Sequence, residues 1–405
     1  MDQDSSHTER TTSTPPDKTA EPDGVVQVDQ KKQDEIRAAC AEADIPELQR
    51  LAESAGGFLT DKLRQLAWPI LLGVPAPSTT ANDEPFPSSE DDGGSWKELP
   101  RHRDEDQVQL DVNRSFVYYP HDLSESDLEW RRSQLSALIS QVLRTCPYLC
   151  YFQGYHDICQ VLLLVLRPAW ASPCVARLSV LRIRDFMLPN LGPTTAQLRL
   201  LPDVLAAADP ALLRHVAAVE PFYALAGTLT MYAHNIDSYR DIARLFDVLL
   251  AREPVFSIYV FAQIVVDRRD EILDVDEPDL LQVILGRVPA NMDLDALVAR
   301  AAVLFAEHPP ERLRAWRRIS RASALRTARD ARRAAGQTLQ EGEAYFERQA
   351  KELRWLDLRN SLLSVAWAYR RPAKAVGMAV AVSLVAFYMR RNPAVVDSIM
   401  SFLAR

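Results

Sequence analysis

The chain has 405 residues, of which 47% are hydrophobic and 25% charged, with only 13 glycines and a formal net charge of −8. Such a chain can bury a sizeable core, and its composition favours helices over the glycine-rich turns of an all-β protein. The negative charge argues against a protein that coats nucleic acid, because such proteins carry a basic surplus.

The N-terminal part changes character twice before the first long loop. Residues 1–33 are almost without apolar side chains and lack a hydrophobic signal segment, so we expect a disordered tail. From Asp34 onward apolar residues recur at helical spacing, and Pro69 must end or kink its helix. Residues 75–99 combine Pro, Ser, Asp and Gly without periodicity and predict a solvated acidic loop.

Helical periodicity dominates the middle of the chain. Apolar faces at helical spacing follow the cap candidates Ser124 and Ser238. Residues 158–166 and 255–266 are apolar on nearly all sides but too short to cross a bilayer, so they predict buried core helices. Strand alternation of useful length and a glycine-rich phosphate loop are both missing from the sequence, which predicts an all-α protein that does not itself bind nucleotide.

The cysteines are typical of a reducing compartment. There are five of them, an odd number, and they include no CxxC pair. Cys146 and Cys150 are four residues apart, but no His or further Cys stands at metal-ligand spacing. We therefore expect free thiols, a cytosolic folded part and no metal site.

The composition changes again near Pro310, where the folded domain, residues 34–310, is expected to end. Residues 311–369 are rich in Arg, Ala, Gln and Glu and predict a polar helical linker. Within residues 370–405, the stretch 373–389 holds one charge, Lys374, between two arginine pairs. As a helix it spans about 25 Å, against roughly 30 Å of hydrocarbon. It predicts a C-terminal transmembrane helix; the alternative is a hydrophobic helix docked on the domain.

Two segments place polar residues within otherwise regular patterns. The first, DQVQLDVNRSF, contains Asp111 and Arg114, and the second, LCYFQGYHDI, contains Tyr151, Gln153 and Gly154. They resemble two motifs of the TBC-domain activators of Rab GTPases. The first resembles the family's Ile-x-x-Asp-x-x-Arg with Val in place of Ile, and the second resembles its Tyr-x-Gln-Gly.

A third motif strengthens this resemblance. The family's Arg-x-x-x-Trp is matched by Arg64 and Trp68, which we expect to be structural. The resemblance covers about residues 58–310, and three motifs in the right order are far more specific than one. It implies a two-part helical TBC fold. His156 and Asp157 stand where many members carry Met-Asn.

The resemblance implies roles for the site residues. Arg114 would be an arginine finger, because a guanidinium stays charged and can cancel charge that develops on phosphate oxygens. Gln153 would position the attacking water, because an amide both donates and accepts hydrogen bonds. Asp111 would orient Arg114, while Tyr151 and Gly154 would support the glutamine loop.

The resemblance also implies a partner and a place. The partner would be a GTP-bound Rab GTPase, to which GTP and Mg²⁺ belong, so the chain needs no cofactor of its own. The motif wording and the apolar C-terminal segment look most like the membrane-anchored branch that acts on early-secretory Rabs. That implies a single-pass protein of the endoplasmic reticulum membrane, with its large domain in the cytosol, that regulates transport to the Golgi.

Two other functions remain open. The His-Asp dipeptides at His121/Asp122 and His156/Asp157 are a weak match to helical metal-dependent phosphohydrolases, which hold metals with such residues. The chain could also be a non-catalytic tether that binds a Rab GTPase on a membrane without accelerating hydrolysis.

Overall fold

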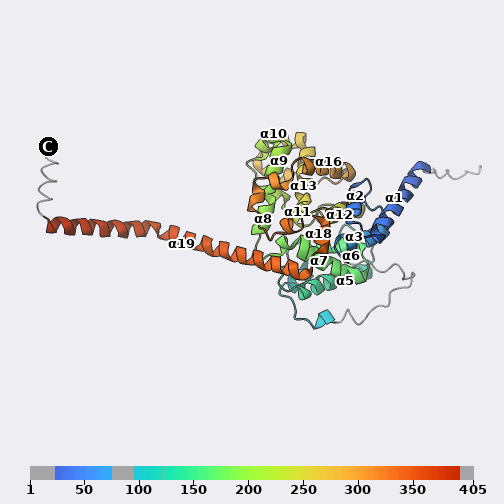
Figure 1. Ribbon diagram of the computed structural model, residues 1–405, viewed down its shortest axis with the longest axis horizontal. Coiled ribbons are helices and arrows are strands. Elements are labelled where there is room, and N and C mark those ends of the chain that lie inside the picture. Colours follow the sequence, from blue (N-terminus) through green and yellow to red (C-terminus); the bar gives the residue numbers. More distant parts are fainter. Residues whose placement is uncertain (1–22, 75–94, 122, 393–405) are drawn as a thin grey trace, which may run out of the picture.

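The computed structural model describes residues 23–74, 95–121 and 123–392, without the side chains of residues 23–28, 95 and 365–377. Every regular element in these ranges is a helix, which confirms the predicted all-α fold (Figure 1). The predicted tail lies outside the described residues as far as residue 22, but its last part belongs to the first helix. The predicted loop 75–99 lies outside them as far as residue 94.

The first half of the chain is a set of helices connected through α6 (Tyr155–Val165). Its α-helices are α1 (Asp23–Ala41), α2 (Ile45–Glu53), α3 (Asp61–Leu71), α4 (Glu105–Val112), α5 (Glu125–Thr145), α6 (Tyr155–Val165) and α7 (Pro168–Arg177). Shorter turns are η1 (Ser95–Glu98), the π-helical η2 (Leu178–Arg182) and η3 (Arg184–Met187). Helix α5 contacts α4, α6 and α7, whereas α1 and α2 pack on α3, and α6 contacts both sets through α3, α4, α5 and α7.

The second half begins at α8 and forms the other side of the body. Its elements are α8 (Gly192–Leu198), α9 (Leu200–Ala208), α10 (Pro210–Val216), η4 (Pro221–Ala224), α11 (Leu225–Leu229), α12 (Tyr239–Ala251), α13 (Phe256–Asp267), α14 (Arg269–Leu273), α15 (Pro278–Gly286) and α16 (Leu294–Glu307). Helix α13 packs on α9 and α16, whereas α12 contacts α2, α3 and α6 and so joins the two halves.

Local sequence signals set where these helices begin. The Ser124 side chain accepts a hydrogen bond from the Asp127 amide at 3.2 Å, and Ser238 caps α12 in the same way. Each serine satisfies one of the amides that a helix leaves unpaired at its start. Helix α3 ends shortly after Pro69, as the sequence predicts.

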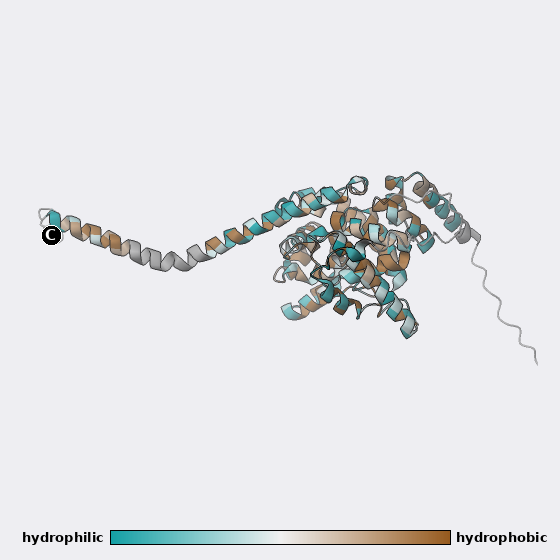
Figure 2. Cartoon of the chain, turned by 90° about the horizontal axis from the view of Figure 1, so that it is seen from below, coloured by the Kyte–Doolittle hydropathy of each residue, from teal (hydrophilic) through white to brown (hydrophobic). Residues whose placement is uncertain are grey.

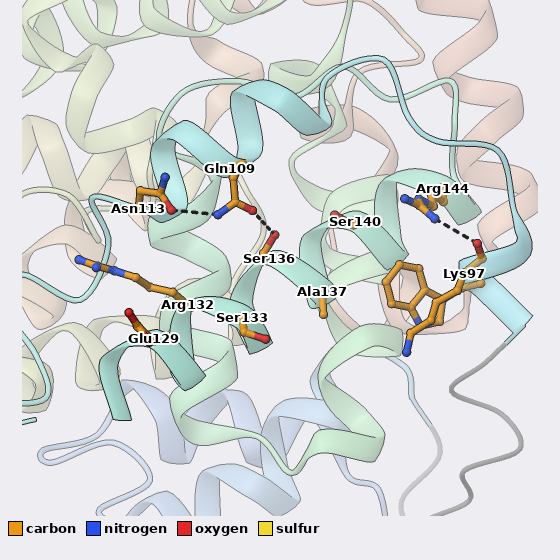
Figure 3. Close-up of a pocket in the computed structure, with 11 residues that line it drawn as sticks. Lys97, Gln109, Asn113, Glu129, Arg132, Ser133, Ser136, Ala137, Ser140 and Arg144 are labelled. Carbon is orange, nitrogen blue, oxygen red and sulfur yellow. Dashed lines mark hydrogen bonds between the residues drawn. The ribbon is translucent and has the colours of Figure 1, made fainter. Parts of the chain in front are cut away.

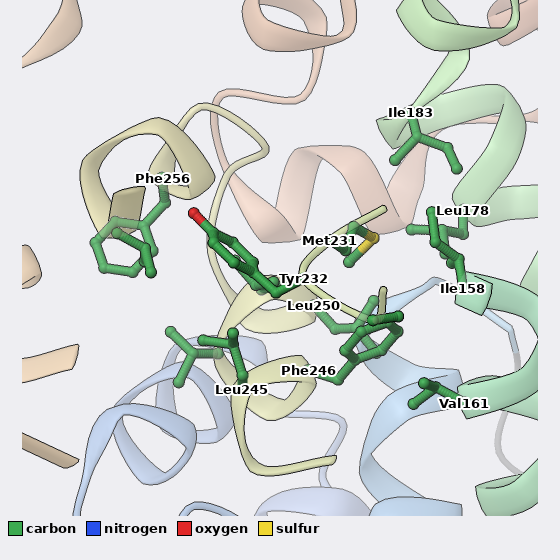
Figure 4. Packing of buried hydrophobic residues seen from close by; sticks show 14 of the residues in the cluster. Ile158, Val161, Leu178, Ile183, Met231, Tyr232, Leu245, Phe246, Leu250 and Phe256 are labelled. Carbon is green, nitrogen blue, oxygen red and sulfur yellow. The ribbon is translucent and has the colours of Figure 1, made fainter. Parts of the chain in front are cut away.

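The apolar helices predicted from the sequence form the core where the two halves meet. Figure 4 shows Ile158 and Val161 of α6 beside Phe246 of α12, with Leu250 of the same helix close by. The helices α6 and α13 are buried along most of their length, so residues 158–166 and 255–266 are core segments as predicted.

A buried ion pair fastens α3 to α12. The Arg64 Nε donates to Asp247 at 3.0 Å, and the Trp68 Nε1 donates to the same carboxylate at 2.8 Å. The Phe58 amide adds a third donor at 3.0 Å. Asp247 is completely buried, so its charge depends on these three donors.

The body continues beyond residue 310, which corrects the predicted boundary. Residues 310–336 form η5 (Pro310–Arg312), η6 (Ala315–Arg318), α17 (Ala324–Thr327) and α18 (Ala331–Gly336), followed by α19 (Leu339–Arg391). Buried Arg184 donates to the Ala322 carbonyl, and buried Asp185 accepts from the Ala324 amide and Gln349. The sequence misleads because the large apolar residues that this segment buries are few and scattered among alanines and arginines, so they give little apolar periodicity.

Helix α19 leaves the body after its first turns. Phe346 and Ala350 are buried, whereas Trp355 and the large apolar residues that follow it are exposed. Figures 1 and 2 show the helix extending away from the body, polar nearer the body and apolar toward its far end.

The predicted transmembrane helix is not supported. Among the described residues, no helix is both long enough and apolar enough to cross a membrane. Residues 393–405 of the predicted anchor, and the side chains of residues 365–377, lie outside the described residues.

Candidate functional site

Arg114 follows the end of α4, where the chain leaves the helix. Its amide donates to the Asp111 carbonyl at 3.0 Å, which continues the helical turn past Val112. The side chain is exposed, and within the described residues it makes no hydrogen bond or ion pair. The guanidinium therefore keeps its donors available.

Gln153 lies in the turn that leads into α6. It is exposed between buried Phe152 and Gly154, which caps α6 with a φ of 100°. A β-carbon at Gly154 would stand 2.6 Å from the Thr230 methyl carbon. Glycine is thus required by the backbone and by the neighbouring turn.

Both exposed side chains border one cleft. Arg114 and Gln153 line a cavity of about 280 Å³, together with Asp111, His156, His234 and other residues. Val117 and Tyr118, which are 70% and 46% exposed, also line it. The structure brings the two candidate finger residues together on one face, as the resemblance implies.

Asp111 lies in the floor of the cleft and does not contact the Arg114 side chain. It is buried, and its carboxylate accepts hydrogen bonds from the Tyr151 hydroxyl at 2.8 Å and from the side-chain amide of Gln107 at 3.0 Å. Burial, followed by the bond to Asp111, raises the pKa of Tyr151 well above its ordinary value. The Asp111 carboxylate is therefore engaged by Tyr151 and Gln107, and the hydrogen bond between Asp111 and Arg114 runs through the backbone.

His156 and Asp157 extend this floor from the first turn of α6. His156 Nε2 lies 3.1 Å from Asp157, and His234 Nδ1 lies 3.2 Å from the other Asp157 oxygen. Burial alone would raise the pKa of Asp157, but the bonds from the two histidines lower it. The bond to Asp157 in turn raises the pKa of His234, against the effect of desolvation.

The metal-dependent hydrolase alternative is not favoured by this geometry. His156 and Asp157 bind each other, while His121 is exposed and Asp122 lies outside the described residues. In the described part of the chain, no group of three or more His, Cys, Asp or Glu side chains is arranged to hold a metal ion.

Two residues that the sequence did not single out complete the site. Gln160 accepts from the Phe116 amide at 3.0 Å and donates to the Tyr119 carbonyl at 3.3 Å, so it fixes the loop that follows Arg114. His234 reaches the cleft from the turn between α11 and α12. A polar side chain within the apolar segment 158–166 was a usable signal for Gln160, whereas nothing in the sequence links His234 to the glutamine loop.

A larger polar groove lies beside the cleft, between η1, α4 and α5 (Figure 3). It has a volume of about 630 Å³. Gln109 joins its two walls, because its amide donates to Asn113 at 2.9 Å and its oxygen accepts from Ser136 at 3.1 Å. Arg144 donates to the Lys97 carbonyl at the other end of the groove.

Known proteins are similar to this chain in sequence and in fold. Residues 61–273 match the Rab-GTPase-TBC domain family. GTPase-activating protein gyp10 of Schizosaccharomyces pombe is 34% identical over 307 residues, which are 73% of this chain and 78% of that protein. TBC1 domain family member 20 of Homo sapiens is 36% identical over 274 residues, which are 67% of this chain and 65% of that protein, slightly less than two thirds of its length.

Two solved structures have a similar fold, and at their low sequence identity the similarity is evidence for the fold only. The Ypt/Rab-GAP domain of Gyp1p superposes with a TM-score of 0.52 at 14% identity, over 65% of this chain and 93% of that one. A Chlamydomonas flagellar RabGAP TBC domain gives 0.52 at 16% identity, over 69% of this chain and 92% of that one. Since the family match covers more than half of the sequence, and the Schizosaccharomyces pombe relative is matched over 78% of its length, the chain belongs to the Rab-GTPase-TBC domain family.

Proposed function

We propose that this protein accelerates GTP hydrolysis by a Rab GTPase and supplies Arg114 and Gln153 to the partner's nucleotide site. One observation carries the proposal. An arginine and a glutamine stand exposed on the same cleft, above a buried polar floor, in a member of the Rab-GTPase-TBC domain family. In the described residues neither side chain is engaged within the chain itself.

The two side chains suit two separate requirements of the reaction. Hydrolysis of GTP needs charge stabilisation on the phosphate oxygens and correct placement of the attacking water. A guanidinium meets the first need with a planar set of donors, and in related GTPases such a group supplied in trans raises the rate by roughly 10³ to 10⁵. A neutral amide meets the second need. GTP and Mg²⁺ are the partner's, so the chain contributes side chains only.

The loops that carry the two residues are fixed from below. Gln160 holds the segment after Arg114 by two bonds to its backbone, and Gly154 sets the direction in which the Gln153 loop enters α6. Preorganised groups cost no rearrangement when the reaction occurs, which is the main source of such catalysis. The fold therefore presents both groups ready for a partner to dock.

The test is single-turnover GTP hydrolysis by a panel of purified Rab GTPases with the full-length protein in mild detergent. The wild type, Arg114→Ala and Gln153→Ala are compared, with Arg333→Ala, an exposed arginine on α18, as the control. We expect the wild type to accelerate GTP hydrolysis by one or a few Rabs. Arg114→Ala and Gln153→Ala should lose this acceleration but still bind the GTP-bound Rab. Binding without acceleration by the wild type would instead identify a tether.

We further propose that the partner is an early-secretory Rab and that the protein works on the endoplasmic reticulum membrane. The residues of the two motifs, which look most like the branch of the family that acts on early-secretory Rabs, support the proposed partner. The proposed location on a membrane is supported by the far end of α19, where Val382, Leu384, Phe387 and other apolar side chains are exposed on a helix that has left the body. Exposed apolar surface of this kind is typical of a membrane or protein contact. Flotation with liposomes and carbonate extraction test the attachment; a protein that stays soluble in both contradicts it.

A further inference from the structure

A continuous series of hydrogen bonds and one His–Asp ion-pair contact runs beneath the cleft. The Tyr151 hydroxyl bonds Asp111 at 2.8 Å and lies 3.2 Å from His156 Nδ1. His156 Nε2 is 3.1 Å from Asp157, which is 3.2 Å from His234 Nδ1. Five side chains thus link α4, the glutamine loop, α6 and the turn before α12.

The geometry points to Asp157 as a positioning residue that fixes where Gln153 stands relative to Arg114. Asp157 lies in the first turn of α6, directly behind the loop of Gln153, and its two oxygens face different partners. One side leads through His156 and Tyr151 to α4, which ends just before Arg114. The other is held by His234. This inference rests on the proposed function, since it explains how the two finger residues keep their spacing.

The far end of the chain of bonds is firmly anchored. Tyr232, two residues before His234, is fully buried, and its hydroxyl donates to the Ser257 carbonyl at 2.7 Å. Met231 and Tyr232 both have positive φ, at 49° and 67°, so this turn has one defined path. The His234 amide also donates to the Thr230 hydroxyl at 3.3 Å. The turn can therefore act as a fixed support for Asp157.

Burial distinguishes Asp157 from an ordinary surface ion pair. Its side chain is 16% exposed and that of His156 is 12% exposed, so water competes little for their bond. The His234 side chain is 63% exposed, and its ring lines the cleft on the side that a partner would cover. Docking would remove that water and tighten the His234–Asp157 contact at the moment when Gln153 is needed.

Side-chain substitutions separate support from direct contact. We compare Asp157→Asn, His234→Ala and His234→Asn, because Asn keeps a donor near the position of Nδ1 and lacks the outer ring nitrogen. We expect Asp157→Asn and His234→Ala to lower the maximal rate of GTP hydrolysis about 10- to 100-fold at an unchanged KM for the GTPase. His234→Asn should restore most of that loss. If His234→Asn is as slow as His234→Ala, the ring itself contacts the partner and the inference is wrong.

A second comparison asks whether Asp157 acts through Gln153. In a Gln153→Ala background, adding Asp157→Asn should cost nothing further, because the group that it positions is already gone. An equal loss in both backgrounds would overturn the inference. Asp267→Asn, which loosens an exposed pair with Arg300 on the other side of the body, is the matched control and should leave the rate unchanged.

Hydrogen exchange tests, without any GTPase, whether Asp157 links the loop of Gln153 to the turn of His234. In Asp157→Asn the amides of residues 151–157 and 230–236 should both exchange at least several-fold faster, with the rest of the body and the melting temperature unchanged. Unchanged exchange in both segments contradicts the inference, whatever the activity. A wild type that accelerates no Rab would instead refute the proposed function, while the exchange experiment still tests the support.

Discussion

Two arginines from two recognisable motifs end in opposite situations. Arg64 is 6% exposed and donates to Asp61 and Asp247, so every part of its guanidinium serves the fold. Arg114 is exposed at the end of α4 and, in the described residues, has no side-chain partner. The sequence presents both as motif arginines. Only the surroundings show that one guanidinium is bonded inside the protein, while the other has no bonded partner among the described residues.

The carboxylates nearest to these arginines differ in the same way. Asp247 is surrounded by Arg64, Trp68 and the Phe58 amide. Asp111 is occupied by Tyr151 and Gln107, which leaves the guanidinium of Arg114 unneutralised. A cation that is not paired within its own fold is available to a phosphate, and this contrast gives the predictions their order.

The largest effect is expected at Arg114. Arg114→Ala should reduce GTPase acceleration by about 10³-fold or more, because the charge stabilisation in the transition state is lost. Arg114→Lys should recover little, since an ammonium lacks the planar set of donors. Single-turnover hydrolysis measures the rate, and circular dichroism checks that the fold is intact. Full activity of Arg114→Ala would move the finger role elsewhere.

Arg64→Ala should lower the stability of the fold and leave the acceleration of GTP hydrolysis nearly unchanged. Removing one partner of a buried ion pair leaves Asp247 charged and unpaired, which costs about 3 to 5 kcal/mol of folding stability. The free energy of unfolding in urea measures this loss. At a temperature where the variant stays folded, acceleration per folded molecule should be near that of the wild type. A stable but inactive variant would contradict the structural role.

Gly154→Ala comes next, because it strains the loop that carries Gln153. A β-carbon there meets positive φ and the Thr230 methyl at 2.6 Å, so we expect a loss of about 1 to 3 kcal/mol in stability. Thr230→Ser removes the methyl group and keeps the hydroxyl that binds Ala226 and His234. The double variant should therefore recover part of the loss in thermal unfolding, while the contribution from φ remains. No recovery would assign the whole cost to the backbone.

The smallest effect is the pH dependence of the His234–Asp157 pair. Because the pKa of His234 is raised, its contribution to stability is fully present below the pKa of an unfolded histidine and is lost as pH rises through the folded value. The pKa of Asp157 is lowered, so its contribution is present above the unfolded value and is lost as pH falls through the folded one. His234 is largely exposed, so the contribution should stay below about 1 kcal/mol.

Urea unfolding of the wild type and His234→Ala from about pH 5 to about pH 9 tests this sign. The stability difference between them should be greatest at the acidic end and shrink as pH rises. A difference that is constant with pH would mean that the charge of His234 does not contribute.

Much of the fold could be predicted from the sequence, because helices have local sequence signals. The apolar faces of α5 and α12, the serines that cap them and the buried segments of α6 and α13 follow from spacing and cap chemistry. The boundary at residue 310 was not readable. Between residues 313 and 350 the buried apolar side chains are alanines and a few scattered large apolar residues, and the bonds to Arg184 and Asp185 join positions far apart in the sequence.

By itself, the sequence determined the residue types of the site, since a motif fixes Arg114, Gln153 and Gly154 by chemistry and spacing. It also determined that the chain is helical. The tertiary structure decided which arginine is buried in an ion pair, which carboxylate Tyr151 binds, and that His234 meets Asp157 across 77 residues of chain. Those outcomes depend on which helices pack side by side, and no local pattern contains that information.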